Sequence, residues 1–99
     1  MAVQVVFHWL AAHEARQADA WYASRSPEAA TRFRAAVLAA AHRIADGVRT
    51  HPIAGTRFHY ARVDRFPYRL IFCFESPTTA RVIAVAHSRR RPGYWRQRR

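Results

Sequence analysis

The 99 residues suit one domain, and a hydrophobic fraction of 51% indicates a folded globule rather than a disordered tail. Seventeen basic residues, all arginine, oppose six acidic ones, so the formal net charge is +11. Such an imbalance favours an anionic partner, which is nucleic acid, an acidic protein segment or a membrane surface. No apolar run approaches the roughly 20 residues of a transmembrane helix. We expect one cytoplasmic domain over residues 1–99, with no signal peptide and no membrane span.

The first half of the chain predicts a strand and two helices. Residues 3–8 alternate in polarity and are rich in valine, which is typical of a strand. Residues 10–24 are alanine-rich and predict a helix whose polar residues, Glu14 among them, turn away from its apolar face. A second helix is predicted over residues 27–46, because Ser26-Pro27-Glu28 favours a helix start and Gly47 a helix end. The short link between the two helices predicts an antiparallel hairpin.

The second half of the chain predicts three strands. Residues 58–63, 68–75 and 81–86 are rich in β-branched and aromatic side chains, and the middle run is apolar on both faces, as in a central strand. Residues 64–67 and 76–79 contain proline and predict the breaks between the strands. The fold class is therefore α+β, in the order β-α-α-β-β-β, with a helical hairpin packed on a mostly antiparallel sheet.

Residue types that usually carry metal or nucleophilic chemistry show no productive spacing. The histidines lack metal-ligand spacing, the carboxylates are scattered, and Cys73 is the one cysteine. We expect Cys73 to be a buried, inert thiol within a strand, and its isolation fits a reducing compartment. The histidines that we expect to be surface or half-buried residues are His8, His13, His42, His51 and His59. We expect no metal, no cofactor and no assigned catalytic residue.

The segment of residues 87–99 combines arginines with Tyr94 and Trp95 directly after a predicted strand. Arginine favours bidentate contact with phosphate or carboxylate groups, and the two aromatic residues offer stacking surfaces or hydrophobic anchors. The alternative is a solvated basic tail whose two aromatic residues fold back on the sheet. Two adjacent aromatic residues among arginines favour a shaped binding surface.

Three residues outside the arginine run could extend this surface. Arg62 and Arg69 flank the break at residues 64–67, so both could lie on the sheet face that the helices leave uncovered. Each is also compatible with an ordinary exposed arginine. His87, at a strand end, could transfer protons if the target were RNA, although a structural histidine is the simpler interpretation.

The sequence resembles the RelE/ParE superfamily of toxins from bacterial type II toxin–antitoxin modules. The resemblance rests on Phe66-Pro67-Tyr68-Arg69, on the run from Val82 to Trp95, and on Trp21-Tyr22 before the second helix. It extends over nearly the whole chain and agrees with the predicted strand and helix order. The F-P-Y-R and H-x-R-R patterns are more similar to the ParE branch. Arg91 and Ser88 depart from the acidic residue and the glycine that are common in the family.

The resemblance implies a toxin that binds and inhibits DNA gyrase and is neutralised by a cognate acidic antitoxin. The expected target- or antitoxin-binding residues are Arg62, Arg69, His87, Arg89, Arg90, Arg91, Tyr94, Trp95 and Arg96. The alternative is a RelE-like endoribonuclease that cuts mRNA on the ribosome. Its catalytic residues would be His87, Arg89, Tyr94, Arg62 and Arg69. A general nucleic-acid-binding domain is a third interpretation.

Overall fold

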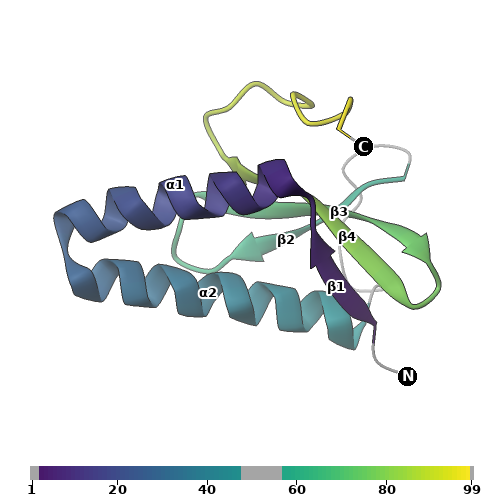
Figure 1. Ribbon diagram of the computed structural model, residues 1–99, viewed down its shortest axis with the longest axis horizontal. Coiled ribbons are helices and arrows are strands. Elements are labelled where there is room, and N and C mark those ends of the chain that lie inside the picture. Colours follow the sequence, from purple (N-terminus) through teal and green to yellow (C-terminus); the bar gives the residue numbers. More distant parts are fainter. Residues whose placement is uncertain (1–2, 48–56, 99) are drawn as a thin grey trace.

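The structure is a computed structural model that describes residues 3–47 and 57–98, in which two helices pack on a four-stranded sheet (Figure 1). In chain order, the elements are β1 (Gln4–Phe7), α1 (Trp9–Arg25), α2 (Pro27–Asp46), β2 (His59–Val63), β3 (Tyr68–Ser76) and β4 (Thr79–His87). This order confirms the predicted α+β fold. The predicted bounds of α2 are those observed, and the other elements differ from their predicted bounds by one or two residues at an end.

The sheet has the strand order β1-β4-β3-β2. β3 pairs with β2 and β4 in antiparallel fashion, while β1 pairs in parallel with the first part of β4, from Thr79 to Val82. The prediction of a mostly antiparallel sheet is therefore confirmed. Because β1 ends at Phe7 while β4 continues to His87, the last part of β4 has no strand on its outer edge.

Local sequence explains why the two helices form a tight hairpin. Ser26 ends α1 by donating its backbone N–H to the Tyr22 carbonyl, and it begins α2 by accepting the Ala29 N–H on its hydroxyl oxygen. Pro27 occupies the first turn of α2, where no backbone N–H is needed. One residue thus caps two helices, and the chain reverses direction between them.

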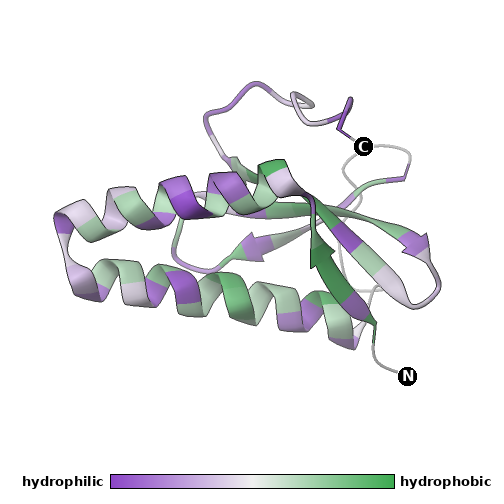
Figure 2. Ribbon diagram, in the orientation of Figure 1, coloured by the Kyte–Doolittle hydropathy of each residue, from purple (hydrophilic) through white to green (hydrophobic). Residues whose placement is uncertain are grey.

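Two apolar clusters lie on opposite faces of the sheet. The larger is covered by the helices and contains Phe33, Ile44, Leu70 and Phe72, each at most 1% exposed. On α2, Ala30, Phe33, Ala40 and Ile44 are buried and Val37 is partly buried. The smaller cluster includes Ile71, Cys73 and Trp95 on the other face. Figure 2 shows β1 as largely hydrophobic and the C-terminal segment as mostly hydrophilic.

His8 corrects one prediction. It is 2% exposed rather than a surface or half-buried residue. Its ring nitrogen Nδ1 accepts the Leu10 backbone N–H at 3.0 Å, so His8 caps the start of α1. Of the other histidines in that prediction, His13 and His42 are exposed, His59 is half-buried, and His51 lies outside the described residues.

Candidate binding surface of the C-terminal segment

The C-terminal segment, residues 88–98, folds back across the sheet through a series of turns. Backbone N–H groups donate to carbonyls three residues earlier at Arg90, Tyr94, Arg96 and Arg98. Gly93 has a φ of 77°, a left-handed conformation that glycine adopts without strain. Figure 1 shows the segment, in yellow, passing the start of α1 on the side away from α2. The segment is therefore folded rather than a free tail.

Trp95 anchors the segment in the smaller apolar cluster. Its side chain is 5% exposed and packs with Ile71 and Ile83, while its ring meets Phe58 edge-on at a centroid distance of 4.7 Å. Burying an aromatic ring of this size is among the strongest single contributions to packing. Trp95 therefore acts as a hydrophobic anchor and does not offer a stacking surface in this conformation.

Glu14 holds the segment at a second point. Its carboxylate accepts hydrogen bonds from the two terminal guanidinium nitrogens of Arg98, Nη1 and Nη2, each at 2.9 Å, and from the Tyr94 hydroxyl at 2.7 Å. The Arg90 guanidinium lies 3.9 Å away. The side chains of Glu14 and Arg98 are only 10% and 13% exposed. A bidentate pair with so little solvent contact fixes the geometry of both partners. We call Glu14, Tyr94 and Arg98 the Glu14 clamp.

The Glu14 clamp also satisfies the outer edge of β4 beyond β1. Glu14 accepts the Val85 backbone N–H at 2.9 Å, and Arg98 donates to the Ile83 carbonyl at 3.0 Å. Both backbone groups lie where a neighbouring strand would otherwise pair. The ion pair therefore replaces one strand pairing at this edge, and unpaired buried backbone groups would otherwise be costly.

The electrostatics of the clamp follow from this geometry. Burial alone would raise the pKa of Glu14, but the hydrogen bonds from Arg98, Tyr94 and Val85 outweigh it and hold that pKa below its ordinary value of 4.5. Burial and the hydrogen bond to Glu14 raise the pKa of Tyr94 far above 10.0. Glu14 is thus charged and the Tyr94 hydroxyl is protonated at neutral pH.

Sequence reasoning missed the role of Glu14, which was expected to turn away from the apolar face of α1. Ala11, Glu14 and Ala18 share one face at the spacing i, i+3, i+7, and both alanines are buried. That spacing was the signal that could have identified Glu14. Its partners lie 71 to 84 positions further along the chain, beyond the range of any local pattern.

The predicted arginines take up two arrangements around the clamp. Two lie over aromatic rings: Arg90 lies 3.8 Å from the Tyr94 ring centroid, and Arg96 lies 5.8 Å from that of Trp95. Arg89 and Arg91 are exposed. Four residues therefore present positive charge from a fixed backbone, namely Arg89, Arg90, Arg91 and Arg96. Arg99 lies outside the described residues.

Arg62 and Arg69 lie on the sheet face opposite the helices, as expected. They are direct cross-strand partners on β2 and β3. Arg69 stacks on Tyr60, which packs against the smaller apolar cluster, at 4.6 Å from the ring centroid. Both arginines line a cavity of about 440 Å³ that also includes Ser88, at the start of the C-terminal segment. The structure therefore brings these two arginines beside the segment.

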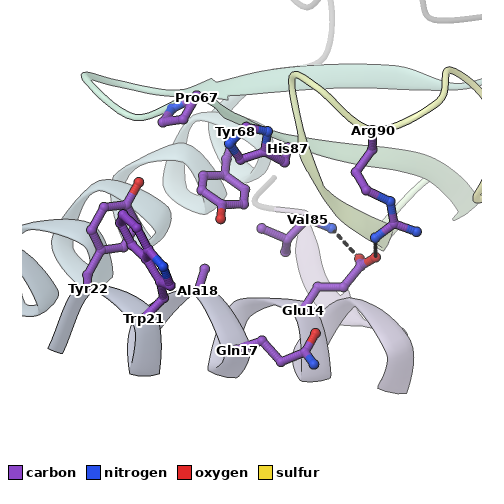
Figure 3. A pocket seen from close by; sticks show the side chains of 10 residues that line it. All are labelled: Glu14, Gln17, Ala18, Trp21, Tyr22, Pro67, Tyr68, Val85, His87 and Arg90. Atoms are coloured by element: carbon purple, nitrogen blue, oxygen red, sulfur yellow. Dashed lines mark hydrogen bonds and ion pairs between the residues drawn. The ribbon is translucent and has the colours of Figure 1, made fainter. Parts of the chain in front are cut away.

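His87 ends β4 and has a structural role. Its Nδ1 accepts the Arg89 backbone N–H at 3.0 Å, and its ring meets Tyr68 edge-on at 5.0 Å. Both contacts fix the turn into the C-terminal segment. His87 and Tyr68 also line a second cavity of about 430 Å³ between β4 and α1, which Figure 3 shows from close by.

Other candidate chemistry is limited within residues 3–47 and 57–98. There, no three histidine, cysteine or acidic side chains come together in a way that could hold a metal ion. Cys73 is 6% exposed, and burial raises the pKa of its thiol, which makes it a poor nucleophile. Neither helix in these ranges is long and apolar enough to span a membrane.

Comparison with known proteins agrees with the fold. No curated protein matches the chain. Residues 5–92 match the family described as the ParE toxin of the type II toxin–antitoxin system, parDE. The match includes both helices, β2, β3 and β4, all of β1 except Gln4, and the first arginines of the C-terminal segment. It ends before Tyr94, Trp95 and Arg98, which anchor the segment. Because the match spans most of the sequence, this chain belongs to the ParE toxin family of type II toxin–antitoxin systems.

Proposed function

We propose that this toxin acts in the cytoplasm by binding DNA gyrase and inhibiting it without breaking a bond itself, and that an acidic antitoxin neutralises it. The observation that carries the proposal is the anchored C-terminal segment. Trp95 and the Glu14 clamp hold its backbone, while Arg89 and Arg91 remain exposed. Fixed charges on a folded surface favour a specific protein contact, because little side-chain and loop ordering is then lost on binding.

The same geometry weighs against the endoribonuclease alternative. In that alternative Tyr94 and His87 would move protons. The Tyr94 hydroxyl donates to Glu14 and its pKa is raised by burial, so it is a poor proton donor or acceptor near neutral pH. His87 uses Nδ1 to accept a backbone N–H in the turn. Both groups are therefore engaged in holding the fold.

Charge supports an acidic antitoxin as the first partner. The chain carries a formal net charge of +11, and exposed arginines lie on both the C-terminal segment and β2. An acidic segment that folds along this surface would relieve the self-repulsion of these arginines. We expect co-expression with a neighbouring acidic reading frame to suppress toxicity. Undiminished toxicity would contradict the pairing.

The deciding experiment measures gyrase supercoiling and DNA cleavage with purified toxin, in parallel with primer extension on mRNA that is being translated. We expect inhibition of gyrase at micromolar toxin and no new mRNA ends. New ends on the mRNA together with unaffected gyrase would overturn the proposal in favour of the endoribonuclease.

A matched pair of variants locates the effect on the surface. Arg91→Gln removes one exposed charge from the C-terminal segment, and Arg32→Gln removes one from α2. We expect the first to weaken gyrase inhibition several-fold and the second to leave it unchanged. Equal effects would mean that net charge, rather than the segment, determines inhibition.

A further inference from the structure

The outer edge of β4 has two backbone groups that neither β1 nor the Glu14 clamp covers. Ser88 donates its backbone N–H to the Pro67 carbonyl on the β3 side, and Val85 donates to Glu14 on the opposite side. Since residues alternate along a strand, the Val85 carbonyl and the His87 N–H both face outward. Among the described residues, neither group takes part in a hydrogen bond outside the strand ladders of the sheet.

An aromatic cavity adjoins these two groups. It has a volume of about 430 Å³, and its walls include Trp21, Tyr22 and Tyr68 as well as Val85 and His87 (Figure 3). Trp21 is 53% exposed, which is unusual for so large an apolar side chain. The cavity therefore offers an apolar contact directly beside an unpaired strand edge.

One wall of the cavity is positively charged. Arg90 lines it, and Arg25 lies over the Trp21 ring at 4.5 Å from the centroid. Glu14 also lines the cavity, and its carboxylate pairs with Arg98 at 2.9 Å and lies 3.9 Å from Arg90. One carboxylate faces these two arginines, so the net charge at this wall is positive and favours an acidic ligand.

We propose that this edge receives a short extended segment of the acidic antitoxin as an added strand. Its backbone N–H donates to the Val85 carbonyl and its backbone carbonyl accepts the His87 N–H. One apolar or aromatic side chain enters between Trp21 and Tyr68, and a neighbouring carboxylate meets Arg90. Backbone pairing would supply affinity and the cavity would supply specificity, as in other cases of strand addition. The proposal rests on the proposed function, because it takes the antitoxin as the source of the segment.

The first test is amide hydrogen exchange by NMR, on ¹⁵N-labelled toxin alone and in complex with the co-expressed product of the adjacent acidic reading frame. We expect the His87 amide to exchange at least tenfold more slowly in the complex. A stable complex in which this amide is unchanged would overturn the strand addition while leaving the toxin–antitoxin pairing intact. If no complex forms, the antitoxin part of the proposed function fails, and this proposal fails with it.

The second test separates the backbone group from the side chain at residue 87. His87→Ala keeps the N–H, whereas His87→Pro removes it at an outward-facing edge position where proline is tolerated. Loss of one hydrogen bond predicts that the proline variant binds the antitoxin roughly five- to tenfold more weakly than the alanine variant. If both variants fold and bind the antitoxin with equal affinity, the proposal is overturned. If the proline variant does not fold, the amide exchange of His87 decides whether the strand addition occurs.

The contribution of the aromatic cavity can be tested with two tryptophan variants of the same helix, one inside the cavity and one outside it. Trp21 lines the cavity near the end of α1, whereas Trp9 begins that helix and is 69% exposed. We expect Trp21→Ala to weaken antitoxin binding at least tenfold and Trp9→Ala to change it less than twofold. The reverse ranking would place the contact elsewhere on the toxin.

Discussion

On one face of the sheet, two helices cover a broad apolar cluster, and on the other face a short arginine-rich segment covers a small one. The helix face joins Tyr22, Phe33, Phe66 and Tyr68 in mutual ring contacts with centroids 5.0 to 6.5 Å apart. The opposite face depends on Trp95 and on the Glu14 clamp. The first face therefore contributes most of the stability, while the second holds the exposed arginines of the C-terminal segment on a fixed backbone.

The largest expected effect comes from the helix face. Phe33→Ala removes a ring that is 1% exposed and touches three other aromatic rings, so it should lower the free energy of unfolding by about 4 kcal/mol. Urea unfolding followed by circular dichroism measures this loss. A loss below about 1 kcal/mol would show that the helix face is not the main source of stability.

On the opposite face, Trp95→Ala should lower the free energy of unfolding by less than Phe33→Ala does, and its effect should be confined to the C-terminal segment. We expect a loss of about 3 kcal/mol, with fast amide exchange over the C-terminal segment and slow exchange retained in β3. Hydrogen exchange resolved by residue distinguishes these regions. Equal acceleration in the sheet and the segment would mean that the two faces unfold together, which would remove the contrast between them.

The next largest loss of stability is expected from a change in the Glu14 clamp. Glu14→Gln leaves the Arg98 charge without its partner and should destabilise the protein by about 2 kcal/mol. Glu75→Gln is the matched control, because its ion pair with Arg81 is 42% and 33% exposed, and we expect a change within about 0.5 kcal/mol. Thermal or urea unfolding of both variants provides the comparison.

Acid should release the C-terminal segment before it unfolds the sheet. The pKa of Glu14 is held below its ordinary value of 4.5, so its charged form stabilises the folded state. The stabilisation by charged Glu14 is fully present above pH 4.5, the ordinary pKa of the carboxyl group. It is lost as the pH falls through the lower pKa that Glu14 has in the folded state. Following the Trp95 indole N–H signal by NMR from pH 7 downward measures the release. A segment that remains docked after Glu14 is protonated would show that Trp95 alone is sufficient.

The smallest effect is expected away from both faces, in the turn between β2 and β3. Arg65 has a φ of 71°, a left-handed conformation that costs energy for a residue with a Cβ. Arg65→Gly should relieve this cost and raise the free energy of unfolding by about 0.5 kcal/mol, since glycine also loses more entropy on folding. A measured decrease in urea unfolding would contradict this explanation.

The sequence predicts the structure of the sheet face that the helices cover better than that of the face that the C-terminal segment covers. Ser26, Pro27 and Gly47 determine the ends of α2 through local capping, and the apolar spacing from Ala30 to Ile44 identifies its buried stripe. Local patterns could not reveal that β1 pairs in parallel with β4, or that Trp95 inserts beside Ile71. These contacts join distant parts of the chain, and only the folded sheet brings them together. The roles of the arginines in binding stay predictions.

The sequence separation within the Glu14 clamp has a consequence for biosynthesis. Glu14 and Arg98 are 84 positions apart, so their ion pair can close only after the chain through Arg98 has left the ribosome. The helical hairpin, whose contacts are local, can form much earlier. A partner that meets the nascent chain therefore finds a folded hairpin and an undocked segment. Neutralisation during translation would act on a different surface from neutralisation of the finished toxin.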